Sequence, residues 1–129
     1  MEKNAVSWAM SLLSRTPEPP YYAVIFSSQR TEGEAGYGAM AQRMDEMARQ
    51  QPGFLGVDSV RGTDGVGITV SYWESEEAIR RWKANEKHQA AQEGGKRTWY
   101  ADYIVRVAKV ERAYALEDGH EQSQSASSA

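Results

Sequence analysis

The chain has 129 residues, a formal net charge of −3 at neutral pH and no cysteine. This length suits one domain with a hydrophobic core of its own. The lack of cysteine excludes disulfides, thiol nucleophiles and cysteine-ligated metals. The mild acidity argues against nucleic acid as the main partner, and no apolar run is long enough to span a membrane. Together these features predict a soluble, cytoplasmic protein.

The two ends of the chain differ from its middle. Residues 1–20 form an N-terminal extension in which apolar residues favour a short helix, ended by Pro17, Pro19 and Pro20. Residues 117–129 are rich in Ser and Gln and have almost no apolar side chains. Such a segment cannot offset the entropy lost on ordering, so a disordered tail is expected. The domain is therefore expected to span residues 21–116.

The first half of this domain predicts a strand, a helix and a second strand. Residues Tyr21–Gln29 are rich in β-branched and aromatic side chains, which favour a strand. Apolar residues then recur at spacings of three and four over residues 37–51, which is typical of an amphipathic helix. Pro52-Gly53 ends this helix, and Phe54–Arg61 is the second strand.

The second half repeats this pattern after a hairpin. Residues 62–65 carry two glycines and an aspartate, a tight-turn signal, and Val66–Trp73 follows as the third strand. Ser75 is the expected cap of the second helix, because its hydroxyl can accept from an amide of the first turn. That helix runs to about Gln92, and Tyr100–Tyr114 alternates as a long last strand.

The order β-α-β-β-α-β predicts the ferredoxin-like α+β fold, in which one antiparallel sheet carries two helices on one face. The strands are apolar on both faces, since Ala23 and Ile25 alternate with Val24 and Phe26. A sheet with one solvated face alternates more cleanly between apolar and polar residues. We therefore expect the second face to pack against another copy of the chain, giving a homodimer.

Three motifs carry a family resemblance. They are Gln51-Pro52-Gly53-Phe54-Leu55-Gly56, then Ile68-Thr69-Val70-Ser71-Tyr72-Trp73-Glu74-Ser75, then Trp82-Lys83 with Glu86-Lys87-His88. Together they resemble the antibiotic biosynthesis monooxygenase (ABM) domain family, a branch of the dimeric α+β barrels. The resemblance covers residues 21–114 and neither tail. It implies a small dimer with a pocket in each subunit between the sheet and the helices.

The resemblance also implies a chemistry that uses no metal and no flavin, so no cofactor is expected. The substrate would be a small aromatic phenol or quinol, which reduces dioxygen itself once it is deprotonated. The protein would supply binding, a base and exclusion of water. His88 is the candidate base, because an imidazole titrates near neutral pH. The candidate substrate-binding residues are Trp82, Tyr72, Phe26, Met44 and Asn85.

Four of these residues also have a structural interpretation. Trp82 and Met44 fit a hydrophobic core, Tyr72 fits cross-strand packing, and His88 fits a hydrogen-bonded position at the rim of the barrel. No His-x-x-x-His or other metal-ligand spacing is present. A non-catalytic dimer that binds a hydrophobic small molecule is therefore an alternative function.

Haem binding or degradation is the third and least favoured function. The haem-degrading branch of the family uses a Trp that matches Trp82, an Asn on the first strand, and a His whose position corresponds to Gln92. The strand Tyr21–Gln29 contains no Asn, and glutamine is a poor axial ligand for haem iron. Two of the three functional residues are thus missing.

Overall fold

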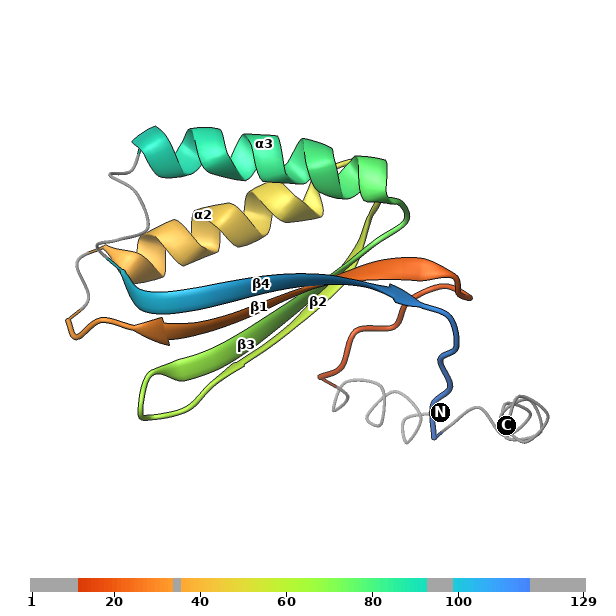
Figure 1. The fold of residues 1–129 in the computed structure, drawn as a ribbon, viewed down its shortest axis with the longest axis horizontal. Helices are drawn as coiled ribbons and strands as arrows, with labels where there is room; N and C mark the ends of the chain where they lie inside the picture. Colours follow the sequence, from red (N-terminus) through yellow and green to blue (C-terminus); the bar gives the residue numbers. More distant parts are fainter. Residues whose placement is uncertain (1–11, 34–35, 93–98, 117–129) are drawn as a thin grey trace, which may run out of the picture.

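The computed structural model describes residues 12–33, 36–92 and 99–116. In these residues, four strands form one antiparallel sheet and two helices cover one of its faces (Figure 1). The elements are, in chain order, β1 (Tyr21–Arg30), α2 (Tyr37–Arg49), β2 (Phe54–Arg61), β3 (Val66–Trp73), α3 (Glu76–Gln92) and β4 (Tyr100–Val110). This is the predicted β-α-β-β-α-β order, so the ferredoxin-like α+β fold is confirmed.

The observed and predicted bounds agree for β2 and β3 and differ for β4. The sequence pattern predicted a strand to Tyr114, whereas β4 ends at Val110. The reason lies in the neighbouring strand, because β1 begins at Tyr21, directly opposite Val110. Residues beyond Val110 therefore have no strand to pair with. The tail expected at 117–129 and most of the short helix expected within 1–20 lie outside the described residues.

The strands lie in the order β2-β3-β1-β4, so β1 and β3 are central and β2 and β4 are the edges. Ile25 of β1 lies opposite Val70 of β3 and Arg106 of β4, and all three pairs of strands are antiparallel. This register places Val24 and Phe26 of β1, with the residues opposite them on β3 and β4, on the face under the helices. The residues between them lie on the opposite face.

The hydrophobic core is centred on Trp73 at the end of β3. Its side chain is completely buried against Ala78 and Ile79 of α3. Phe54 meets the Trp73 ring edge-on at 5.5 Å between centroids, and Trp82 stacks on it at 5.9 Å with 21° between the planes. The Trp73 indole N–H donates to Ser71 Oγ at 2.9 Å, so this buried polar group is satisfied.

The helix-to-strand junctions explain two of the sequence motifs. Ser75 Oγ accepts from the Ala78 amide at 3.1 Å, which confirms the predicted cap of α3. Gly53 has a φ of +89°, and a Cβ atom there would lie only 2.6 Å from Ala78 Cβ. Any other residue at position 53 would be strained and would push α3 away from the sheet. The glycine therefore fixes the distance between the two elements.

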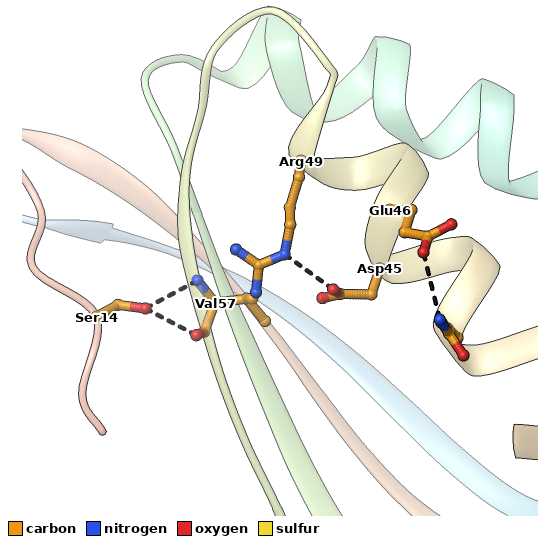
Figure 2. A network of polar contacts seen from close by, with 6 residues as sticks. Ser14, Asp45, Glu46, Arg49 and Val57 are labelled. Carbon is orange, nitrogen blue, oxygen red and sulfur yellow. Dashed lines mark hydrogen bonds and ion pairs between the residues drawn. The ribbon is translucent and has the colours of Figure 1, made fainter. Parts of the chain in front are cut away.

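The lead-in before β1 covers the free edge of β2. Figure 2 shows the Ser14 hydroxyl donating to the Val57 carbonyl at 2.7 Å and accepting from the Val57 amide at 3.0 Å. The Ser14 amide donates to the Asp58 carboxylate at 2.7 Å. These contacts pair backbone groups that an edge strand otherwise exposes to solvent or to another chain.

The face of the sheet opposite the helices is largely open within the described residues. Tyr72 donates to the Asp58 carboxylate at 2.9 Å and meets the Tyr21 ring edge-on at 6.0 Å. Away from this cluster the face carries exposed apolar side chains, namely Val60, Val66, Ile68 and Ile104. An apolar surface of this kind is typical of a face that another protein surface covers.

Candidate functional site

A cavity of about 550 Å³ lies between the sheet and the two helices. Both helices and all four strands contribute side chains to its wall. A volume of this size suits a small organic molecule. The wall has an apolar end formed around Trp82 and a polar end formed around Tyr37 and Tyr100.

The apolar end is formed by the outer layer of the core. Trp82 lies on the cavity side of its stack with Trp73, and Phe54 and Ile79 line the same region. Met44 and Ala48 of α2 complete this part of the wall. Flat aromatic faces and adaptable methionine side chains suit a planar aromatic ligand.

The polar end is formed by the first residues of α2 and β4, Tyr37 and Tyr100. The starts of these two elements lie near the end of β1 (Figure 1). The rings of Tyr37 and Tyr100 meet edge-on at 5.8 Å, and Tyr100 meets Phe26 in the same way at 5.3 Å. The Tyr100 hydroxyl points to the Tyr37 hydroxyl at 3.5 Å. Burial, together with this hydrogen bond, raises the pKa of Tyr100 above its usual value. The Tyr100 hydroxyl therefore remains protonated, as a donor, at neutral pH.

The cavity opens to solvent along β4. Tyr103 and Val107 line it and yet are 43% and 52% exposed, respectively. The helices therefore leave this side of the sheet accessible, and a small molecule can enter the cavity from β4.

Charged residues on both helices form part of the cavity wall. Arg49 of α2 extends toward β2 and pairs with Asp45 at 2.8 Å (Figure 2). Lys83 and Glu86 line the cavity from α3. Glu86 lies one turn after Trp82, so the two share a helix face, and the residue is half-buried where it lines the cavity.

Three of the predicted site residues line the cavity, namely Trp82, Phe26 and Met44. The structure thus brings together one residue from α3, one from β1 and one from α2. These contacts place the residues where a ligand would lie, and their roles in binding stay predictions.

The other three predicted site residues lie elsewhere. Tyr72 faces the opposite side of the sheet, where Asp58 binds its hydroxyl. Asn85 donates to Gln51 Oε1 at 2.9 Å and so ties α3 to the end of α2. His88 is exposed on α3 and does not belong to the cavity lining. Its proposed role as a base stays a prediction, and from this position it would need a relay to reach a ligand.

The sequence interpretation missed the tyrosines of the polar end. Tyr37 precedes Met40 and Met44 at helical spacing, so its place on the inner face of α2 was readable from the sequence. Tyr100 was not readable in this way. Its position depends on the irregular register between β1 and β4, where Gln29 lies opposite Asp102 and Arg30 opposite Tyr100.

Within 12–33, 36–92 and 99–116, no three His, Asp or Glu side chains are grouped closely enough to hold a metal ion. No helix in that part of the chain has the length and apolarity needed to cross a membrane.

Comparison with known proteins identifies the family. The model of the antibiotic biosynthesis monooxygenase family matches residues 20–94, and the chain belongs to this family. The chain is also 61% identical over 103 residues to the uncharacterized protein YqjZ of Bacillus subtilis, a match that covers 80% of this chain and 90% of YqjZ.

Solved structures share the fold at low sequence identity. SnoaB, a cofactor-independent oxygenase from Streptomyces nogalater, matches with a TM-score of 0.58 at 16% identity over 78% of this chain and 100% of its own. PA3566 from Pseudomonas aeruginosa matches with a TM-score of 0.57 at 15% identity over 76% of this chain and 99% of its own. At these identities the similarity concerns the fold alone.

Proposed function

We propose that the protein is a monooxygenase that needs no cofactor and acts on a small aromatic phenol or quinol. The observation that carries the proposal is the cavity of about 550 Å³, which has an aromatic end at Trp82 and hydroxyl groups at the other. Membership of the monooxygenase family supports the reaction class. The fold is also that of SnoaB, a cofactor-independent oxygenase.

In the proposed chemistry the chain binds the substrate ring, excludes water and accepts a proton. The walls hold the ring of the substrate flat beside dioxygen and exclude bulk water, which makes the deprotonated ring more reactive toward dioxygen. The carboxylate of Glu86 accepts the substrate proton, because it lines the cavity where His88 does not. Dioxygen then takes electrons from the substrate. With anthrone, one oxygen atom becomes the new carbonyl and the other leaves as water with the two hydrogens of the methylene group.

Incubation of the protein with anthrone and a panel of quinols, in air and under argon, tests this proposal. Anthraquinone should form faster than in buffer alone in air, and prior dialysis against a chelator should not change the rate. Equal product in air and under argon would exclude an oxygenase.

A non-catalytic binding protein is the second candidate function. It is favoured by the exposed position of His88, which leaves the predicted base outside the cavity. Binding of an aromatic ligand without any dioxygen uptake would support it. Haem binding remains the least favoured function, and a hemin titration without a shift of the Soret band would exclude it.

We further propose that the open face of the sheet packs on a second copy. The support is the set of exposed apolar side chains on this face. They belong to strand residues that alternate in sequence with the residues under the helices. A sheet-to-sheet contact would bury these side chains without disturbing the helices or the cavity wall they cover.

A further inference from the structure

Two tyrosine hydroxyls converge at the polar end of the cavity without forming a strong contact. The oxygen atoms of Tyr37 and Tyr100 are 3.5 Å apart. A good hydrogen bond between hydroxyls measures about 2.7–2.8 Å, so this contact is weak. A third oxygen placed between the two could accept a hydrogen bond from each of them. Both residues line the cavity, so a ligand can supply that oxygen.

Two guanidinium groups lie behind this pair of hydroxyls. The Arg30 guanidinium carbon lies 3.6 Å from the centroid of the Tyr37 ring. A cation on the face of a phenol ring favours negative charge at its oxygen and so strengthens the hydroxyl as a donor. The positive charges of Arg61 and Arg30 also act on Tyr100, where they partly oppose the effect of burial on its pKa. The field of both cations thus reaches the hydroxyls.

Arg61 is held in place by the sheet. It donates to Ser28 Oγ at 2.7 Å and to the Gly65 carbonyl, and its side chain crosses β3 at Gly67. A Cβ atom at position 67 would lie 2.8 Å from the guanidinium carbon of Arg61. Glycine at position 67 therefore leaves the space that the guanidinium group of Arg61 occupies above β3.

The two cations are not neutralised by carboxylates in the described part of the chain. Arg49, Arg80 and Arg81, by contrast, each pair with a carboxylate there. In the same residues, the Nε atom of Arg30 is buried and lacks a hydrogen-bond partner. A buried donor without a partner, together with positive charge that no described carboxylate pairs, favours an anion nearby.

We propose that Tyr37 and Tyr100, backed by Arg30 and Arg61, form a subsite for an aromatic oxyanion. A phenolate or ring carboxylate accepts hydrogen bonds from both hydroxyls, while its ring extends toward Trp82. Donors that converge on one oxygen in a water-poor site stabilise negative charge strongly. This inference rests on the proposed function of the cavity as a site for aromatic ligands, and it specifies that the ligand binds as an anion.

The test is calorimetric binding of three inert probes: 2-naphthoate, its neutral analogue 2-naphthamide, and naphthalene. The wild-type protein should bind 2-naphthoate most tightly. Tyr100→Phe and Tyr37→Phe should each weaken 2-naphthoate about tenfold or more, because a hydrogen bond to a charged group is lost. Naphthalene should change less than about twofold, which also shows that the cavity is intact. Arg61→Met should remove the preference for 2-naphthoate over 2-naphthamide.

Tyr22→Phe is the matched control. Tyr22 packs against the core on the same face of the sheet but outside the cavity lining, so its loss of a hydroxyl should leave all three affinities unchanged. Unchanged 2-naphthoate binding in both tyrosine variants would overturn the subsite and leave the proposed function standing. Equal weakening of 2-naphthoate and naphthalene would overturn it as well. A wild-type protein that binds none of the probes would contradict the proposed function itself.

Discussion

The two faces of the sheet are built from the same strands and differ in what covers them. Under the helices, Trp73 is completely buried and the remaining space forms the cavity. On the opposite face, Val60 is 66% exposed, Ile68 45% and Ile104 48%. The apolar residues of a strand thus do not reveal which face holds a ligand. The helices decide it, because they cover one face incompletely and leave a shaped space.

The difference also separates two kinds of tyrosine. Tyr100 lies in the cavity wall beside another tyrosine and two cations. Tyr72, on the opposite face, is bound by a carboxylate that also binds the lead-in segment. We infer a ligand role for the first and a structural role for the second. Five predictions test the comparison between the covered face with its cavity and the open face, from the largest expected effect to the smallest.

Trp73→Ala tests the covered face. The change leaves a large cavity in the core, and we expect the free energy of unfolding to fall by about 3–5 kcal/mol. Urea denaturation followed by far-ultraviolet circular dichroism measures it. Tyr114→Ala, at a residue that is 66% exposed beyond β4, should cost less than about 0.5 kcal/mol. Similar losses in both variants would contradict the position of the core.

Ile68→Lys tests the open face. If a second copy covers this face, the variant buries an unpaired ammonium group, and the dissociation constant of the dimer should rise about a hundredfold or more. Analytical ultracentrifugation measures the association. Gln42→Lys adds the same charge to the exposed side of α2 and should leave the dimer intact. A wild-type protein that is monomeric at micromolar concentration would refute the proposed contact.

Glu86→Gln tests the proton acceptor in the cavity wall. The amide keeps the size of the side chain but cannot take a proton, so we expect kcat for anthrone to fall about tenfold or more with little change in KM. Glu46→Gln is the control, because Glu46 is exposed on α2 and outside the cavity lining. Equal kcat values for wild type and Glu86→Gln would remove Glu86 from the mechanism.

Tyr72→Phe tests the structural role on the open face. Loss of the hydrogen bond to Asp58 should cost about 1 kcal/mol of stability and leave anthrone turnover unchanged. Burial, with the hydrogen bond to Asp58 next, raises the pKa of Tyr72 to about 12. The folded state thus binds this proton more tightly than the unfolded chain, whose tyrosine pKa is about 10. The associated stability is complete below about pH 10 and is lost as the pH rises toward 12.

Tyrosine absorbance during an alkaline titration measures this shift. The wild-type protein should show one more late-titrating tyrosine than Tyr72→Phe. An identical late phase in the two proteins would contradict the environment assigned to Tyr72.

His88→Ala has the smallest expected effect. The side chain is exposed and lies outside the cavity lining, so anthrone turnover should change by less than about twofold. Steady-state dioxygen uptake measures it. A tenfold loss with unchanged stability would show that His88 reaches the substrate through a relay, and would restore it as the base.

The sequence predicted the fold closely because local signals agreed. Spacing, the Ser75 cap and the Pro52-Gly53 stop placed the elements within a few residues. The sequence predicted the site less well. Helix spacing places Trp82 and Met44 on an inner face, but it does not show whether a cavity remains beside them. The position of Tyr100 depends on a strand irregularity, and the partner of Tyr72 depends on register. Neither follows from residue type.

Isotope-labelled dioxygen tests the central claim most directly. Anthrone is incubated with the protein under ¹⁸O₂ in ordinary water, and the anthraquinone is analysed by mass spectrometry against a buffer blank. The account predicts enzyme-dependent product that carries a single ¹⁸O atom, at a rate that falls when Trp82 is replaced by alanine. Product formed no faster than in the blank, or labelled from water instead of dioxygen, would contradict a monooxygenase.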